Sequence, residues 1–518
     1  MCFKNVFLVT LLLCISQCVE IFGPKYRPSK GAVWPKPKKE SRAEQFYNLH
    51  SSSFHFKVTD KTCSILLKAI NRYSDIVKNP EMKKASSTEV DNQENFLGFL
   101  TQLEVILTQP CEEHPSYGMD ESYTLKILST PQLKSASIWG ILRGLETFSQ
   151  LLYYSSDYNQ IHINKNIIED SPSYIHRGLL LDTARHYISV NRILETLDAM
   201  SYNKMNVFHW HMVDDQSFPY QSERFPELSE KGAYAPWMVY TKADIKKIIE
   251  HARDRGIRVI PEFDVPGHSR AWGNAFPGIL TKCGNSLGPM DPSSDTVYNI
   301  VQELYRELKT IFPDDHFHLG GDEVDTDCWS KNPSLMEYIK ERGTEVNKIQ
   351  NLFMETIMPL LNDSKLIVWE ETFTSGAKLP KDTIVHVWKY KEEERMKEVL
   401  SAGHKVIYSS QYYLDFLQCN WEFFYKYDPR EMMTLISGDL NLDDIIGGEA
   451  CMWSEKVNDA NVISRVWPRA SAFAERFWSG GPATDSPPID VYRRIEEHTC
   501  RMIQRGISAE PPSGAGLC

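Results

Sequence analysis

The sequence has 518 residues, more than one hydrophobic core usually serves, so we expect a catalytic domain and a smaller companion. The formal net charge is −12, which argues against a nucleic-acid partner, because phosphate binding needs a concentrated surface of lysine and arginine. The one stretch rich in lysine and proline, from Pro24 to Lys39, is interpreted as part of a solvated linker over residues 19–43.

The first 18 residues have the layout of a cleaved signal peptide: a cationic start, a short apolar run and small residues. The run is too short for a spanning helix and no later segment is long enough, so we expect no stable membrane insertion. Retention of an uncleaved segment is the alternative. Entry into the secretory pathway predicts a lysosomal or secreted protein.

Eight cysteines remain after residue 18. An even set in an exported chain indicates disulfide bonds, whose connectivity the sequence leaves open. No Cys or His spacing typical of a zinc site is present, so we predict neither a metal nor another cofactor. The single N-glycosylation sequon, at Asn362, agrees with export.

Residues 44–172 mix strand-like runs with one helical pattern, from Gln132 to Tyr153. They contain no cluster of convergent acids or histidines. We therefore predict a small non-catalytic α/β domain here.

From residue 173 onward, short apolar strands alternate with amphipathic helices, which is typical of a parallel sheet covered by helices. The expected strands are Arg177–Asp182, Asn206–His211, Arg258–Phe263, Phe317–Gly320, Leu366–Trp369, Ile384–Trp388, Lys405–Tyr408 and Ile445–Glu449. Eight is the number that closes a barrel. The sequence thus predicts a (β/α)8 TIM barrel over residues 173–518.

The segments between these strands carry helical signals. Ile193, Leu197 and Met200 fall on one face of such a segment. In the next segment, Thr241 and Asp244 form a candidate capping box. These boundaries support the alternation of strands and helices.

Chemistry in such barrels lies where the strands end on the carboxyl side. Acids and aromatic residues gather at these positions here: Asp182, Arg185, Asp214, Asp215, Asp264, His268, Asp322, Glu323, Trp369, Glu370, Trp388, Tyr413, Asp415, Trp453 and Glu455. We expect them to converge on one rim.

Asp322 and Glu323 follow two glycines, which let the backbone turn sharply and face the acids into a cleft. Glycosidic cleavage commonly needs an acid and a group that stabilises or attacks the anomeric carbon. Side chains of adjacent residues diverge, so these two are poorly suited to be an opposed pair. A nucleophile from elsewhere is required, and an acetamido group on the substrate is one candidate.

Three tryptophans at separate strand ends, Trp369, Trp388 and Trp453, could wall a pocket and stack on a sugar ring. Core packing is the alternative for each one alone. Their shared position at the rim favours the pocket for the set.

The segments RGLLLDTARHY, NVFHWHMVDDQSFPYQS, PEFDVPGHS, HLGGDEVDTDCW and GGEACMWSE resemble family 20 glycoside hydrolases, the β-N-acetylhexosaminidases of the animal lysosomal type. The resemblance covers nearly everything after the signal peptide. It implies a retaining exo-hydrolase in which the substrate's own acetamido oxygen attacks the anomeric carbon.

The resemblance also implies roles for single residues. Glu323 would act as general acid and then base, and Asp322 would orient the acetamido nitrogen and stabilise an oxazolinium intermediate. Tyr413 would hydrogen-bond the acetamido oxygen. The remaining implied substrate-binding residues are Trp369, Trp388 and Trp453 around the acetyl group, Arg185 and Glu455 at the hydroxyls, and Asp214 and His268 in a network linked to Glu323.

The resemblance places Asp415 beside the sugar 6-position, where a carboxylate would accept from a hydroxyl but repel a sulfate. It therefore implies a preference for neutral terminal GlcNAc and GalNAc. For Arg185, a structural ion pair at the strand end is the alternative. The natural glycan stays open between N-glycans, glycolipids, glycosaminoglycan ends and chitooligosaccharides.

Family likeness further suggests a homodimer and three disulfides: Cys63 with Cys111, Cys283 with Cys328, and Cys500 with Cys518. Cys451 would remain a buried thiol, and Cys419 has no assigned partner. A fourth bridge or a dimer contact stays open for these two.

Two other readings compete. His209 and His211 share one side of a strand, as ligands do in barrel metallohydrolases, but the rest of that ligand set is missing. A glycan-binding protein without turnover is the other alternative. The presence of both acids disfavours it.

Overall fold

A computed structural model describes residues 26, 29–50, 52–78, 91–155, 160–361, 363–481, 486–516 and 518. The expected signal peptide at residues 1–18 and the sequon residue Asn362 lie outside the described residues. Over the part of the chain that is described, no helix is long and apolar enough to cross a bilayer.

The N-terminal domain is a mixed sheet with two helices. Its strands are β1 (Lys39–Leu49), β2 (His55–Asp60), β3 (Phe96–Leu100), β4 (Gln102–Leu107), β5 (Tyr123–Ile127), β6 (Gln132–Ser135), β7 (Tyr153–Tyr154) and β8 (Ile161–Asp170), and its helices are α2 (Ser64–Lys78) and α3 (Ile138–Gln150). The strand order is β2-β4-β6-β5-β8-β1-β3, with β7 paired to β8.

The helix expected from Gln132 to Tyr153 is wrong at both ends. Gln132–Ser135 is strand β6, in which Leu133 and Ser135 are buried and their neighbours are not, a period of two that suits a sheet. The Ser137 hydroxyl accepts from the Trp139 N–H and caps α3, which ends at Gln150. Tyr153 then belongs to β7.

The solvated linker expected over residues 19–43 is also wrong where the structure describes it. Trp34 is fully buried, its Nε1 donates to the Ser471 carbonyl (3.0 Å), and β1 begins at Lys39. The lysines and prolines around Trp34 suggested exposure because a single buried residue leaves no periodic pattern.

The second domain is a closed parallel barrel. Its strands are β9 (His176–Asp182), β10 (Val207–Val213), β11 (Arg258–Phe263), β14 (His316–His318), β15 (Lys365–Trp369), β16 (Ile384–Val387), β17 (Lys405–Tyr408) and β18 (Ile445–Met452). Each pairs in parallel with the next, and β18 pairs with β9 to close the ring. The predicted (β/α)8 TIM barrel and its eight strands are confirmed, with bounds that differ by up to three residues.

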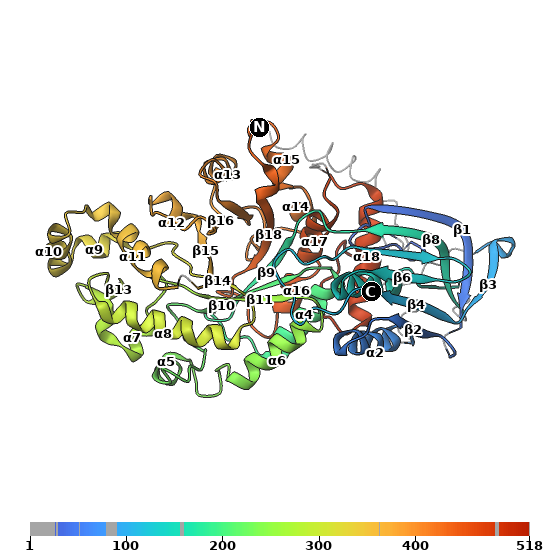
Figure 1. The fold of residues 1–518 in the computed structure, drawn as a ribbon, viewed down its shortest axis with the longest axis horizontal. Coiled ribbons are helices and arrows are strands. Elements are labelled where there is room, and N and C mark those ends of the chain that lie inside the picture. Colours follow the sequence, from blue (N-terminus) through green and yellow to red (C-terminus); the bar gives the residue numbers. More distant parts are fainter. Residues whose placement is uncertain are drawn as a thin grey trace, which may run out of the picture.

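Helices surround this barrel (Figure 1). They are α4 (Val190–Tyr202), α5 (Glu227–Gly232), α6 (Lys242–Arg253), α7 (Trp272–Ala275), α8 (Asp295–Ile311), α9 (Thr326–Ser330), α10 (Pro333–Glu341), α11 (Ile349–Ile357), α12 (Glu370–Thr374), α13 (Glu392–Ser401), α14 (Trp421–Tyr425), α15 (Pro429–Met433), α16 (Val462–Val466), α17 (Arg469–Ser479) and α18 (Ile489–Gln504). A hairpin of β12 (Leu280–Cys283) and β13 (Ser286–Met290) extends one loop. The capping box of Thr241 and Asp244 at the start of α6 is confirmed.

Helix α3 joins the two domains. Every residue of α3 is buried, and Arg143 donates to the backbone carbonyls of Arg255 (3.1 Å) and Gly256 (2.8 Å) at the end of α6. Figure 1 shows α18 on the same side of the barrel, next to the N-terminal sheet. The smaller domain therefore packs away from the carboxyl ends of the barrel strands.

The barrel interior is layered. An apolar layer holds Val207, Ile260, Ile367, Ile384, Ile407 and Ile446. Two residues further along β10 and β11, the inward positions become His209 and Glu262, since side chains alternate along a strand. The core is thus apolar at one end and polar beneath the catalytic rim.

The three expected disulfides are confirmed: Cys63 with Cys111, Cys283 with Cys328, and Cys500 with Cys518. Cys451 is a buried free thiol, as expected, and Cys419 is a half-buried free thiol.

Candidate active site

A cavity of about 820 Å³ opens at the carboxyl ends of the barrel strands. Among the expected site residues, it is lined by Arg185, His268, Asp322, Glu323, Trp388, Tyr413, Asp415, Trp453 and Glu455. The rim position of these side chains is as expected. Asp214 and Trp369 are fully buried and lie outside this lining.

The turn that carries the acids tolerates only glycine. Gly320 and Gly321 have φ of +73° and +96°. A Cβ at Gly320 would lie 1.9 Å from an Asp264 carboxylate oxygen, and one at Gly321 would lie 2.2 Å from the Thr372 hydroxyl. The same Asp264 oxygen accepts from the Gly321 N–H (2.8 Å), so the turn is fixed against strand β11.

Asp322 and Glu323 occupy different environments. Asp322 is 7% exposed, whereas the Glu323 side chain is 57% exposed to the cavity. Glu323 also has a left-handed backbone (φ +46°), which is strained for a residue with a Cβ. The expectation that the adjacent acids do not form an opposed pair agrees with this arrangement.

His268 connects the two acids. Its Nε2 lies 3.6 Å from carboxylate oxygens of both Asp322 and Glu323, an ion-pair distance, and its Nδ1 lies 3.2 Å from Asp214. Burial opposes the imidazolium, but the surrounding carboxylates outweigh it and raise the pKa of His268 far above its usual value. The imidazolium in turn lowers the pKa of Glu323.

Asp264 was expected at the rim, but we assigned it no role. Burial and the charge of Asp322 raise the pKa of Asp264 well above its usual value, which favours the protonated carboxyl and lets it donate to Asp322. Its position just after β11 was visible in the sequence. Its contact with Asp322 depends on the barrel's closure.

Arg185 is held in a cage of acids. Its guanidinium contacts Asp182 (3.1 Å), Asp214 (2.8 Å) and, more loosely, Glu455 (3.9 Å). It also stacks over Trp453, with 4.9 Å from its Cζ to the ring centroid. These contacts preorganise Arg185 at the edge of the cavity, and they include the structural ion pair that was the alternative reading.

The three tryptophans divide into two groups. Trp388 and Trp453 line the cavity, while Trp369 is 1% exposed and stacks on His386 (4.2 Å between centroids) behind them. The expectation that all three wall the pocket therefore holds for two of them. Trp369 supports the wall, with its ring 6.3 Å from that of Trp388 and 6.2 Å from that of Trp453.

Two of these indoles are fixed by carboxylates. Trp369 Nε1 donates to Glu262 (2.8 Å), and Trp388 Nε1 donates to Glu371 (3.0 Å). Glu371 is in turn paired with Lys389 (2.6 Å). We did not predict Glu371, because only the fold brings it to Trp388.

Tyr413 and Asp415 form the wall that follows β17. Tyr413 stacks on Trp388 (5.8 Å), and burial raises the pKa of its phenol, which keeps it a donor. Burial also raises the pKa of Asp415 to about 6. The outer wall adds aromatic residues without a sequence signal, Tyr390, Phe416 and Phe423.

Several polar atoms of the residues that line this cavity lack a hydrogen-bond partner. Among the described residues, six buried polar atoms of residues that line it have no hydrogen-bond partner: Arg185 Nε, His268 Nε2, Asp322 Oδ1, Ser410 Oγ, Asp415 Oδ1 and Trp453 Nε1. Buried polar atoms are normally paired, so such a set indicates a site that a polar ligand completes.

Histidines and carboxylates also group in ways that could hold a metal. One group is His209, His318 and His386, and another is Asp214, Asp215 and His268. His209 faces Glu449 and Glu262, and His211 faces Glu262 and Asp214, each at 2.7–2.9 Å. These contacts occupy the nitrogens that the metallohydrolase reading needs as ligands.

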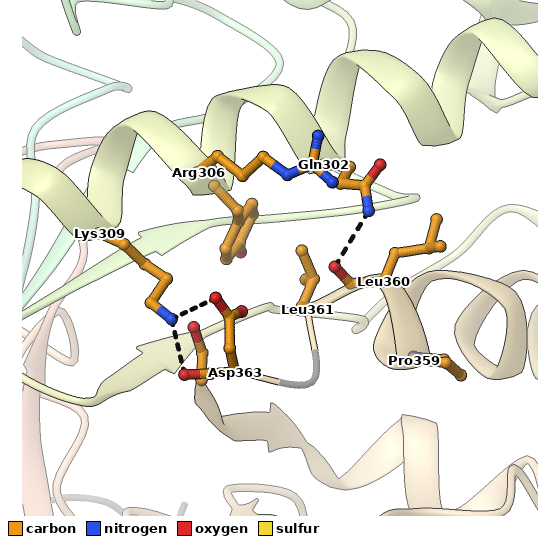
Figure 2. A pocket seen from close by; sticks show the side chains of 9 residues that line it. Gln302, Arg306, Lys309, Pro359, Leu360, Leu361 and Asp363 are labelled. Carbon is orange, nitrogen blue, oxygen red and sulfur yellow. Dashed lines mark hydrogen bonds and ion pairs between the residues drawn. The ribbon is translucent and has the colours of Figure 1, made fainter.

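A second cavity, of about 240 Å³, lies between α8 and residues 359–364 (Figure 2). Lys309 pairs with the Asp363 carboxylate (2.6 Å) and donates to its backbone carbonyl (2.7 Å), and Gln302 donates to the Leu360 carbonyl (3.3 Å). The polar groups there pair with one another across the turn. This cavity therefore gives no indication of catalysis.

Comparison with known proteins agrees with this geometry. Residues 174–481 match the glycosyl hydrolase family 20 catalytic domain, and residues 33–151 match a domain described as beta-acetyl hexosaminidase like. The chain belongs to glycoside hydrolase family 20. The two matches correspond to the barrel and to the N-terminal domain.

Relatives in family 20 cover nearly the whole chain. Beta-hexosaminidase subunit beta of Felis catus is 41% identical over 94% of this chain and 94% of its own length, and the Homo sapiens subunit beta is 39% identical over 99% and 95%. The solved structure of Flavobacterium johnsoniae chitobiase has a TM-score of 0.80 at 29% identity, covering 92% of this chain and 73% of that one. The protein is thus a glycoside hydrolase, a β-N-acetylhexosaminidase.

Proposed function

We propose that this family 20 enzyme removes terminal, non-reducing β-linked GlcNAc and GalNAc with retention, by substrate-assisted catalysis. The acetamido oxygen forms a bond to the anomeric carbon while the glycosidic bond breaks, and Glu323 gives its proton to the leaving oxygen. Water then adds to the anomeric carbon of the oxazolinium intermediate. Glu323 takes the proton from that water.

One observation carries this proposal: Asp322 lines the cavity, and its buried Oδ1 has no hydrogen-bond partner among the described residues. The substrate's acetamido N–H supplies that partner. A buried carboxylate beside a forming oxazolinium stabilises its positive charge, since the low local dielectric strengthens the attraction. Protonated Asp264 can hydrogen-bond the Asp322 carboxyl group and keep it oriented.

The other lining residues take supporting roles. The Tyr413 hydroxyl donates to the acetamido oxygen, and Trp388 and Trp453 pack around the acetyl group, with Trp369 behind them. Arg185 and Glu455 bind the hydroxyls at the non-reducing end. Asp214 contacts His268 and stabilises its imidazolium, which lies next to Glu323.

Asp415 gives the substrate preference. Its open, buried Oδ1 accepts a hydrogen bond from a neutral 6-hydroxyl and repels a 6-sulfate. We therefore infer that neutral sugars are preferred to 6-sulfated ones. N-glycans, glycolipids, glycosaminoglycan ends and chitooligosaccharides all remain candidate substrates, and we propose a homodimer in the lysosome or outside the cell.

The mechanism is tested with aryl glycosides whose N-acetyl group carries zero, one or three fluorines. Fluorine weakens the carbonyl oxygen as a nucleophile, so kcat/KM falls steeply along the series if that oxygen attacks. A protein nucleophile leaves the series nearly flat, which would refute substrate assistance. Proton NMR of the first product formed then shows the β-anomer if the configuration is retained.

Two variants assign the acids. Glu323→Gln lowers kcat by about 10²–10⁴-fold on substrates with poor leaving groups and much less on those with good ones, because only the former need the proton. Asp322→Asn lowers kcat for both. A Glu323→Gln enzyme that is as active as the wild type on poor leaving groups would overturn the assignment.

A further inference from the structure

Imidazoles and carboxylates alternate along the inside of the barrel. At the lower end, His176 on β9 contacts Glu449 on β18 (2.7 Å), and the other oxygen of Glu449 contacts His209 on β10 (2.7 Å). The second nitrogen of His209 lies 2.8 Å from Glu262 on β11. Four strands are thus linked through ionisable side chains.

The alternation continues to the catalytic rim. Glu262 contacts His211 Nδ1 (2.8 Å), and His211 Nε2 contacts Asp214 (2.9 Å). Asp214 contacts His268 (3.2 Å), which lies 3.6 Å from Glu323. The series of contacts that begins at His176 therefore runs through Asp214 and His268 and ends at Glu323, the proposed general acid.

The side chains of this series are buried, where a charge costs more free energy than it does in water. His176, Glu449, His209, Glu262, His211 and Asp214 are each at most 1% exposed. Packing alone does not require them, since the layer of the barrel directly below is filled by valine and isoleucine. Buried ion pairs contribute little net stability compared with apolar residues, but they fix the orientation and charge of their members.

Glu262 is the branching point of the series. Its Oε2 contacts both His209 and His211, and its Oε1 accepts from Trp369 Nε1 (2.8 Å). One carboxylate therefore fixes the imidazole next to Asp214 and the indole that supports the pocket wall.

We propose that Glu262 and Glu449 are positioning residues that act on Glu323 through His211, Asp214 and His268. They hold His211 as a cation with one fixed orientation, which partly neutralises Asp214 and so sets the field that His268 and Glu323 experience. This inference rests on the proposed function, because Glu323 must be the acid for its ionisation to control the rate.

The electrostatics give the direction of the effect. Burial opposes the cationic form of His211, but Glu262 and Asp214 outweigh it and raise its pKa to about 10. Without the Glu262 charge, burial lowers the pKa of His211 and favours its neutral form. Asp214 then loses one cationic neighbour and exerts more negative potential on the rim.

Other charged groups face the rim and stay in place in the variant. Glu323 is faced by His268, Lys389 and Arg185, and His268 is also faced by Asp322 and Asp264. His211 is one contact nearer to Glu323 than Glu262, so the loss of its positive charge outweighs the loss of the negative charge of Glu262. The field at the rim becomes more negative, which raises the pKa of Glu323. The basic limb of the kcat/KM profile moves to higher pH, because more of the enzyme keeps the acid protonated.

The test compares the pH dependence of kcat/KM for the wild type, Glu262→Gln and Glu449→Gln. We expect the basic limb of Glu262→Gln to move up by about half a pH unit or more. Glu449→Gln moves it in the same direction by less, since it acts one imidazole further away. An unshifted limb in Glu262→Gln, with only a uniform loss of rate, would overturn the proposal.

Glu121→Gln is the matched control. Glu121 is a similarly buried carboxylate that pairs with Arg143 (2.8 Å) and Arg177 (2.6 Å). It does not belong to the series of imidazoles and carboxylates inside the barrel. We expect this variant to have a lower melting temperature, whereas the basic limb of its kcat/KM profile stays at the wild-type pH. A shift in Glu121→Gln equal to that in Glu262→Gln would show that lost stability causes the effect and would refute positioning.

A second measurement applies even where Glu262→Gln does not fold. In wild-type protein with ¹⁵N-labelled histidine, NMR reports whether both nitrogens of an imidazole are protonated. His209→Gln and His211→Gln assign the signals. We expect both imidazoles to be cationic at pH 7, and a neutral His211 in the wild type would overturn the proposal.

The failure of this inference is distinguishable from failure of the proposed function. If Glu323→Gln keeps full activity on poor leaving groups, the assignment of the acid is wrong. If Glu323→Gln is impaired and the limb of Glu262→Gln does not move, only the positioning role is wrong.

Discussion

Discrimination against 6-sulfated sugars should depend on pH through Asp415. Its pKa of about 6 means that the carboxyl is about 10% ionised at pH 5 and about 90% ionised at pH 7. A sulfate keeps its charge over this range. If only the neutral carboxyl admits the sulfate, the fraction of competent enzyme falls about tenfold between these pH values.

The assay measures kcat/KM for aryl GlcNAc and aryl GlcNAc-6-sulfate from pH 5 to pH 7. Taking the ratio of the two cancels effects of pH on the shared chemistry. The wild-type ratio of kcat/KM for the sulfated substrate to that for the neutral one should fall about tenfold over the range, whereas that of Asp415→Asn should be higher and flat. A flat ratio in the wild type, or an Asn variant identical to the wild type, would refute the placement of Asp415.

Three further expectations follow from the site. In His268→Asn the cation next to Glu323 is gone, so the Glu323 pKa rises and the basic limb of kcat/KM moves to higher pH; an unmoved limb contradicts this. Gly320→Ala forces a Cβ onto a neighbouring carboxylate and should cost several kcal/mol, about 3 or more, in chemical denaturation, against about 1 for Gly403→Ala, which has a positive φ but open space. The pKa of His211 is raised to about 10, so its contribution to stability is complete below about pH 6.5 and is lost as pH rises to about 10; a melting temperature that is constant over this range would contradict it.

The N-terminal domain shows where a local pattern is read wrongly. Gln132 to Ser135 has both a strand period and the residues of a helix start, and pairing with β4 and β5 decides in favour of the strand. Trp34 is buried by contacts with a segment more than 400 residues away, so the composition around it said nothing of its burial.

The sequence by itself determined the barrel strands, the capping box at the start of α6 and the residues at the rim. These follow from periodicity and from the rule that parallel strands end on the same side, and each needs only neighbours along the chain. The pair of acids that follows two glycines was likewise visible in consecutive residues of the sequence.

Tertiary structure alone decided how these residues are charged and supported. Glu449 meets His209 across 240 positions of sequence, and Glu262 meets Trp369 across 107. Such contacts leave no periodic trace, because they depend on barrel closure and not on neighbours. The raised pKa of Asp415 and the lowered pKa of Glu323 depend in the same way on burial and on charges that only the folded chain brings together.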